Sequence, residues 1–303
     1  MDELHGRRAK LLQHRGNITR QKGDFVGALA HLEEALEHAR LHGDGGLIAQ
    51  IVGDTGSVAL YAGDLDEAGG LLEASLELHI ECDLLDSANL SRGNLGELSR
   101  MRGDLAGARR LFEECVRIAR ERGNRRQELI FITEVAHTDL LLGNHETALA
   151  GYETALELNA EVGDRRRQGR IICGMGQIHM VGEKPDVARS LLTESSRLAE
   201  GVDPPTVGRS RGLLALLAAR GGETDEATRQ MAVAVEHAKR GGWSASVEVA
   251  LIGAEVALLK GDRASSAEAL QGLRQGPFVA SPQWTPQLEQ RLLALEVRAS
   301  RSV

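Results

Sequence analysis

Apolar residues along this chain recur with the spacing of amphipathic helices. In residues 94–121, one apolar stripe runs through Leu95 and Leu98, and a second runs through Phe112 and Val116. Steps of three or four residues place side chains on one face of an α-helix. Because a Gly-Asp pair separates the two stripes, the segment is predicted to fold as two antiparallel helices joined by a short turn.

The same two-helix pattern returns along nearly the whole chain. Each copy has a small residue in its first helix, as at Gly96, and a second small residue twelve positions later, as at Ala108. A large apolar residue follows four positions after that. The glycine between the helices recurs at intervals of 39 or 40 residues, at Gly23, Gly63, Gly103, Gly143, Gly182, Gly222 and Gly261. A fixed period of this length indicates an array of helical repeats rather than separate globular domains.

The period divides the chain into seven helical hairpins and one final helix. We predict repeats at about 2–42, 43–82, 83–122, 123–162, 163–202, 203–241 and 242–281, followed by a capping helix and tail at 282–303. In this last helix Thr285 is the expected cap, Pro286 takes the first position, and the apolar face consists of Leu288, Leu292, Leu295 and Val297. A terminal helix of this kind covers the open end of a repeat stack.

Polar residues directly after the turn glycines are expected to cap the second helices of the repeats. The predicted caps are Asp24, Asp64, Asp104 and Asn144. In the fifth repeat the turn glycine, Gly182, comes one residue early in the alignment. Pro185 then falls in the first turn of the following helix, a position that proline tolerates.

The composition argues against nucleic-acid and membrane binding. Hydrophobic residues make up 42% and aromatic residues 3%, so the predicted core is aliphatic. A net charge of −8 lacks the basic excess that neutralises phosphates. No run of eighteen apolar residues and no signal-peptide pattern occurs in the sequence. The three cysteines form no Cys-x-x-Cys motif, which favours a reducing compartment, and we therefore expect a cytoplasmic protein.

The sequence contains no complete motif for catalysis, metal binding or cofactor binding. His145-Glu146 begins like a zinc-protease helix, but Leu149 stands where the second histidine must coordinate the metal. Gly174-Met175-Gly176 lacks the third glycine of a dinucleotide site and follows no predicted strand. The sequence therefore predicts a protein that is not an enzyme and that has no cofactor and no metal site.

The repeat pattern resembles the tetratricopeptide repeat over about residues 5 to 275. A small residue, a second small residue twelve positions later, a large apolar residue at plus four and a small one at plus seven carry this resemblance. The period is 40 instead of the usual 34, and the Gly93-Asn94-Leu95-Gly96 start is similar to repeats of kinesin light chains. It is also similar to the superhelical arms of bacterial transcriptional regulators and kinases, and to peptide-pheromone receptors of Gram-positive bacteria. The resemblance implies an all-α, right-handed superhelix whose first helices line a concave groove.

The same resemblance implies which side chains face the groove. The candidate binding residues are Gln13, Asn17, Gln50, Asp54, Asn94, Glu97, Glu134, His137, Arg170 and Gln177. Of the five Lys, Asn and Arg residues with which chaperone-binding members grip a terminal carboxylate, only Asn17 has a match, so that function is rejected. The remaining face is polar and neutral to acidic. The alternative interpretation is that these residues are merely a solvated inner surface.

These observations predict a scaffold that holds a peptide segment or a partner protein in its groove. Its expected setting is a bacterial regulatory or signalling system. Two alternatives stay open: a small-molecule or peptide-effector sensor arm of a larger transcriptional regulator or kinase, and an accessory subunit of an enzyme complex. A sensor needs a closed pocket, whereas a scaffold needs an open channel with amide side chains facing it.

Overall fold

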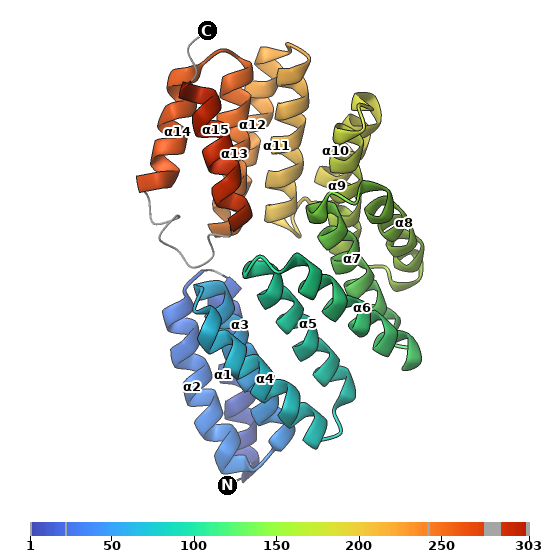
Figure 1. Ribbon diagram of the computed structural model, residues 1–303. Helices are drawn as coiled ribbons and strands as arrows, with labels where there is room; N and C mark the ends of the chain where they lie inside the picture. The colour runs from blue at the N-terminus through green and yellow to red at the C-terminus, as the bar shows by residue number, and fades with distance from the viewer. Residues whose placement is uncertain (1, 22, 241–242, 276–285, 301–303) are drawn as a thin grey trace. The chain divides into compact units, whose positions relative to one another are not determined.

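A computed structural model describes residues 2–21, 23–240, 243–275 and 286–300, and every regular element in these ranges is an α-helix (Figure 1). The prediction of an all-α chain is confirmed. The fifteen helices of the described residues are α1 (Asp2–Gln21), α2 (Phe25–His42), α3 (Gly45–Ala62), α4 (Leu65–Glu81), α5 (Leu85–Met101), α6 (Leu105–Glu121), α7 (Arg125–Leu142), α8 (His145–Val162), α9 (Arg165–Val181), α10 (Pro185–Ala199), α11 (Pro204–Arg220), α12 (Thr224–Arg240), α13 (Trp243–Leu259), α14 (Arg263–Gln275) and α15 (Pro286–Ser300).

The helices belong to two compact units that divide within α7, between Phe131 and Ile132. In the first unit, α1 packs on α2, α3 on α4 and α5 on α6, so each of these pairs forms a helical hairpin (Figure 1). Each second helix also packs on the first helix of the next hairpin, as α2 does on α3 and α4 does on α5. First helices contact one another as well, α1 with α3 and α3 with α5. The arrangement is that of a helical solenoid.

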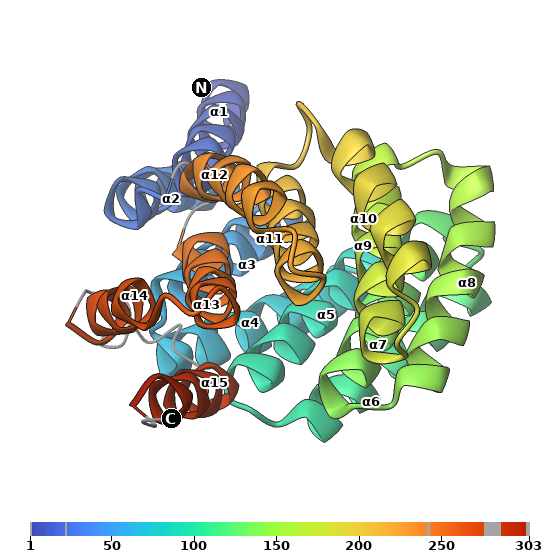
Figure 2. The same ribbon diagram turned by 90° about the horizontal axis from the view of Figure 1, so that it is seen from above.

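The second unit continues this arrangement and ends in a covering helix. Its hairpins pair α9 with α10, α11 with α12 and α13 with α14, and α8 packs on α9 (Figure 2). Helix α15 packs on α13 and α14, and its Leu292 and Leu295 are buried beside Leu270 and Leu273. Val297, which was predicted to share that apolar face, is instead 48% exposed. The predicted cap Thr285 lies outside the described residues.

Small residues in the first helices allow the two helices of a hairpin to approach closely. A methyl group added at Gly96 would lie 2.7 Å from the Phe112 ring, and one added at Gly16 would lie 2.9 Å from Leu32. Ala108, twelve residues after Gly96, is fully buried. The large apolar residue at plus four therefore fills the space that each glycine leaves, and this contact fixes the hairpin.

Turn geometry follows the predicted glycines with one informative exception. Gly103 has φ 86° and Gly143 has φ 82°, values that favour glycine. In the fifth repeat Gly182 has φ −77°, and Glu183 adopts the left-handed conformation instead with φ 55°. Because the glycine comes one residue early, the turn position with positive φ falls on Glu183. A residue with a side chain is strained in this conformation.

Most of the predicted helix caps form. The carboxylates of Asp24, Asp64 and Asp104 each accept a hydrogen bond from the backbone N–H three residues later, at 2.8 to 3.1 Å. Asn144 occupies the cap position of α8 but makes no side-chain cap bond. Its amide instead donates to Asp139 Oδ1 at 3.2 Å, because an acceptor in the preceding helix is within reach.

Candidate functional site

The predicted inner-face residues of the first unit form a hydrogen-bonded cluster between first helices. Gln13 Nε2 and Asn17 Nδ2, both on α1, donate to the same oxygen, Asp54 Oδ2 on α3, at 2.8 and 2.9 Å. Asn94 Nδ2 on α5 donates to Ser57 Oγ on α3 at 3.3 Å. All of these side chains are half-buried, so they are held in place while part of each faces solvent.

The repeat geometry explains why these side chains meet. Asn17 and Asp54, like Ser57 and Asn94, are 37 residues apart, one period less one helical turn. Side chains on a helix lean toward its N-terminus, so a residue reaches a neighbour on the adjacent first helix that is displaced by about a turn. The bonds tie α1 to α3 and α3 to α5 across repeat boundaries.

Two other predicted residues of this unit lie apart from the cluster. Gln50 on α3 is exposed, and no hydrogen bond of its side chain is found within the described part of the chain. Glu97 on α5 pairs with Arg100 one turn later on the same helix. The negative charge of Glu97 is therefore compensated by a residue of its own helix.

In the second unit the predicted inner-face residues are mostly charged and paired. Glu134 on α7 lies 3.7 Å from Arg167 on α9. His137 Nδ1 on α7 lies 3.5 Å from the Tyr152 hydroxyl of α8. Burial lowers the pKa of Arg167. The negative charge of Glu134 acts in the opposite direction, because it favours the charged guanidinium. This part of the face therefore holds first helices together through ion pairs rather than through amides.

Arg170 is bound to an acidic group that sequence reasoning did not identify. Its Nε donates to Asp203 Oδ2 at 2.9 Å, and Arg166 donates to Asp203 Oδ1 at 3.3 Å. The Thr206 hydroxyl donates to Asp203 Oδ2 at 2.7 Å. Burial acts to raise the pKa of Asp203, but Arg170, Thr206 and Arg166 outweigh it and the pKa is lowered. Asp203 is fully buried, so the arginines stabilise its charge.

Gln177 on α9 is half-buried, and no hydrogen bond of its side chain is found among the described residues.

The polar residues on the first helices of the two units differ in chemistry. The first offers amide donors and acceptors around one carboxylate, and the second offers paired charges. Over the described ranges, no group of three or more His, Cys, Asp and Glu side chains is arranged to hold a metal ion.

Buried hydroxyl groups link the helices in a way that sequence reasoning missed. Ser75 Oγ on α4 donates to the Ala49 carbonyl oxygen of α3 at 2.9 Å and lies 3.0 Å from Ser91 Oγ on α5. Ser91 Oγ in turn lies 3.1 Å from His79 Nδ1. Burial lowers the pKa of His79, opposed by Ser75 and by Asp54.

The same linkage returns three repeats later. Ser195 Oγ on α10 donates to the Gly169 carbonyl oxygen of α9 at 2.8 Å and lies 2.8 Å from Ser210 Oγ on α11. Cys115 occupies the equivalent place in the third repeat, and burial raises the pKa of its thiol to about 12. The sequence signal was the small residue at plus seven. Where that residue is Ser75, Cys115 or Ser195, its side chain donates a hydrogen bond to a backbone carbonyl oxygen of the neighbouring helix.

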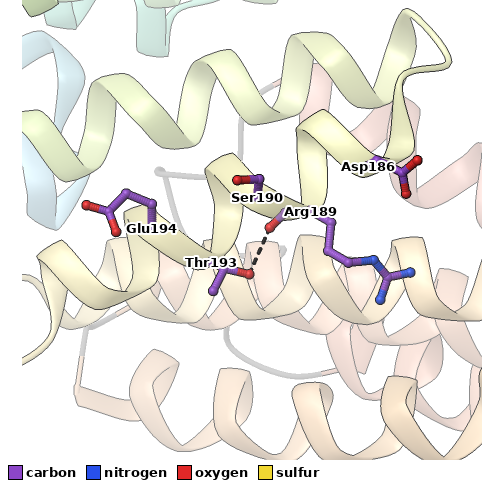
Figure 3. Close-up of a pocket in the computed structure, with 5 residues that line it drawn as sticks. All are labelled: Asp186, Arg189, Ser190, Thr193 and Glu194. Atoms are coloured by element: carbon purple, nitrogen blue, oxygen red, sulfur yellow. Dashed lines mark hydrogen bonds between the residues drawn. The ribbon is translucent and has the colours of Figure 1, made fainter.

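The second unit also has an open hollow, which does not coincide with any predicted site. Its lining residues all come from α10: Asp186, Arg189, Ser190, Thr193 and Glu194 (Figure 3). Arg189 pairs with Glu223 at 2.7 Å, and the Thr193 hydroxyl donates to the Arg189 carbonyl oxygen at 2.8 Å. Glu194 pairs with Arg197 at 2.7 Å, so three of the five lining side chains have partners on the protein itself.

Comparison with known proteins identifies the fold. A family model for the tetratricopeptide repeat matches residues 90–122, the segment from which the repeat pattern was first read. No curated protein matches the sequence. No described helix combines the length and the apolar character that are needed to cross a membrane.

Several solved structures share the fold at low sequence identity. A Rap protein in complex with competence and sporulation factor aligns with a TM-score of 0.74 at 14% identity, over 95% of this chain and 76% of that one. The Rap conjugation gene regulator of plasmid pLS20, solved with the Phr* peptide, gives 0.71 and 14%, over 96% and 76%. Aspartyl phosphate phosphatase F from Bacillus subtilis gives 0.63 and 12%, over 89% and 76%. The chain is therefore a helical solenoid of the tetratricopeptide-repeat fold.

Proposed function

We propose that the inner face of α1, α3 and α5 binds an extended segment of a peptide or partner protein. The observation that supports this is the amide cluster in which Gln13 and Asn17 share one oxygen of Asp54. These half-buried amides are already held in place on rigid helices. They therefore lose little conformational entropy when a ligand binds.

The chemistry of the cluster suits a peptide backbone. Each amide uses its NH₂ group to donate to Asp54, and no bond to the Gln13 or Asn17 carbonyl oxygen is found among the described residues. Those oxygens are acceptors for backbone N–H groups, while the second hydrogen of each NH₂ is a donor for backbone C=O. Side-chain amides therefore match both polar groups of a peptide unit.

The spacing of the repeats fits an extended ligand. Packed helices lie about 8–10 Å apart, and an extended chain advances about 3.3–3.6 Å per residue. Each repeat step between first helices thus corresponds to about three peptide residues. The two steps from α1 to α5 therefore correspond to a ligand segment of roughly six residues on this spacing.

The comparisons support a binding role and leave its details to experiment. One similar structure is a complex with competence and sporulation factor and another is a complex with the Phr* peptide, whereas a third is a phosphatase. We infer that this chain acts without catalysis, in the cytoplasm, as part of a regulatory system. We further infer that its repeats follow the boundaries predicted from the sequence.

A peptide selection tests the proposal. Random twelve-residue peptides displayed on phage are selected against the wild-type chain, and enriched peptides are measured by fluorescence anisotropy. We expect Asn17→Ala and Asp54→Ala to weaken binding by about tenfold or more, which corresponds to about 1.4 kcal/mol. The matched control is Gln290→Ala, an exposed amide on α15.

Two results would reject the inner face as the binding site. One is a failure of the selection to enrich any peptide. The other is a set of enriched peptides that bind Asn17→Ala and Asp54→Ala as tightly as wild type. Circular dichroism melts of each variant show that the fold is retained.

A further inference from the structure

Three arginines surround one carboxylate in the second unit. Glu255 on α13 has only 17% of its side chain exposed. Its Oε1 lies 3.7 Å from both Arg220 Nη2 of α11 and Arg298 Nη1 of α15. Its Oε2 lies 3.8 Å from Arg291 Nη2, also of α15. We call these four residues the arginine cluster. It has three positive charges to one negative charge, in a chain whose net charge is −8.

None of the contacts in the arginine cluster is a hydrogen bond. An N–H···O bond spans about 2.7–3.2 Å, and the three distances to Glu255 are longer. Elsewhere in the chain, arginines that share a carboxylate do bond to it, as Arg120 and Arg125 donate to Glu128 at 2.7 and 2.9 Å. The three guanidinium groups of the cluster therefore have N–H donors without an acceptor in the described part of the chain.

Helix α15 is held in place by contacts that do not involve Glu255. Arg291 and Arg298 are seven residues apart, so they project from one face of α15. The anchoring side chains are different ones: Leu292 and Leu295, which are buried, and Glu289 and Glu296, which pair with Arg274 of α14 at 2.7 and 2.8 Å. These contacts account for the docking of α15 without the arginine cluster. The excess of positive charge in the cluster therefore needs another explanation.

A phosphate monoester matches the charge and the donors of the arginine cluster. At pH 7 it carries a charge of about −1.5 to −2 and has three terminal oxygens that accept hydrogen bonds. Guanidinium groups bind such oxygens with two parallel N–H donors. The three arginine side chains are 37% to 47% exposed, so a ligand can reach them. A carboxylate has a single negative charge, and it would neutralise only one of the two excess positive charges.

We propose that the arginine cluster binds the phosphate group of a phosphate monoester ligand. The group lies on the solvent side of the three guanidinium groups, because Glu255 is the more buried residue and repels it. In the absence of ligand, Glu255 reduces the repulsion among the three positive charges. This site is in the second unit, and it goes beyond the peptide binding proposed for α1, α3 and α5 without resting on it.

Titration with inorganic phosphate tests the proposal. Isothermal titration calorimetry of the full chain is done at pH 8, where most of the phosphate is dianionic, and at constant ionic strength. We expect saturable binding that weakens when the experiment is repeated at higher salt. Arg291→Gln and Arg298→Gln should each weaken binding by about tenfold or more, because each removes a charged hydrogen-bond donor.

Removal of the carboxylate should have the opposite effect. Glu255→Gln takes away the negative charge that repels the ligand, so phosphate binding should become roughly threefold tighter or more. A purely structural role of Glu255, in which it holds the arginines in position, predicts weaker binding instead. The sign of this change therefore separates a ligand site from a structural ion-pair cluster.

Two control variants should leave the affinity for phosphate unchanged. Arg229→Gln removes an exposed arginine of α12 that pairs with Glu226, so it tests whether any surface arginine has the same effect. Asn17→Ala changes the amide cluster of the first unit. Failure of peptide binding at the inner face and failure of phosphate binding at the arginine cluster are thereby distinguished.

Two further probes separate the possible sources of the phosphate group. Glycerol 3-phosphate represents a small phosphate ester, and a short peptide with one phosphoserine flanked by alanines represents a phosphorylated protein segment. Tighter binding of either probe than of inorganic phosphate supports the proposal and identifies the source. The same peptide without the phosphate group should not bind.

Three outcomes would overturn the proposal. The first is the absence of saturable phosphate binding by wild type. The second is binding by Arg291→Gln and Arg298→Gln that is as tight as that of wild type, with circular dichroism melts showing that both variants are folded. The third is weaker binding by Glu255→Gln, which would make the cluster a structural one.

Discussion

Two glycine-to-alanine substitutions should have opposite effects on stability. Gly96 on α5 faces the Phe112 ring, and an added methyl group would lie 2.7 Å from it. Gly70 on α4 is exposed, and an added methyl group there would meet nothing within 4 Å. The chemical change is the same, and both sites are inside helices, so the difference between the variants reports the packing of the hairpin.

Two free-energy terms of different size decide whether alanine stabilises or destabilises the protein at each site. Alanine is favoured over glycine inside a helix by about 0.5–1 kcal/mol. Overpacking a dense core costs about 1–3 kcal/mol. Phe112 is only 2% exposed and has little space into which to move. Gly70→Ala should therefore stabilise the protein by about 0.5–1 kcal/mol, and Gly96→Ala should destabilise it by about 0.5–2 kcal/mol.

Urea unfolding followed by far-ultraviolet circular dichroism measures both variants against wild type. A repeat protein can unfold in stages, so the comparison uses the midpoint of the transition and its slope. If Gly96→Ala raises the midpoint as much as Gly70→Ala does, the two helices are not in tight contact there. The fourth repeat already has Ala136 at this position, and its aromatic residue, Tyr152, lies against Gly174 of α9 instead.

Three further predictions concern the turns, the thiols and acid sensitivity. Glu183→Gly should stabilise the protein by roughly 0.5–1 kcal/mol in the same urea assay, because glycine relieves the left-handed strain at φ 55°. Cys82 is exposed and the other two thiols are buried, so one thiol should react with Ellman's reagent in the native state and three in denaturant; rapid reaction of all three would contradict the packing. The pKa of His79 is lowered in the fold, so below its ordinary value near 6.5 only the unfolded state gains a proton, and stability falls as the pH drops from 7 toward the folded pKa. His79→Ala should reduce that loss between pH 7.5 and 5.5, measured by urea unfolding at each pH.

Most of the fold could be predicted because every repeat uses the same contact, in which a small residue of the first helix packs against a large apolar residue of the second. Small residues, turn glycines and cap residues all return with the period. An ambiguous helix or turn in one repeat can therefore be assigned from the equivalent residues of the other repeats. The exceptions are where a single repeat departs from the pattern. Asn144 bonds to Asp139 because that acceptor is close by, and Glu183 takes the left-handed turn because its glycine comes one residue early.

The hydrogen-bond and ion-pair partners of a side chain could be predicted less well than the helix and the face on which it lies. The sequence places Gln13, Asn17 and Asp54 on one face, but nothing in it states that two amides donate to one oxygen. Arg170 was expected to be available for a ligand, and instead it pairs with Asp203. Asp203 precedes two prolines and has the sequence context of a loop, so its burial depends on how α11 packs and could not be derived from the pattern.

The shared carboxylate on α3 gives the first two hairpins a mechanical connection as well as a polar surface. Asp54 accepts hydrogen bonds from Gln13 and Asn17 of α1, and these bonds cross the boundary between neighbouring hairpins. A ligand that competes for these two amides would therefore also act on the contact between the first two hairpins.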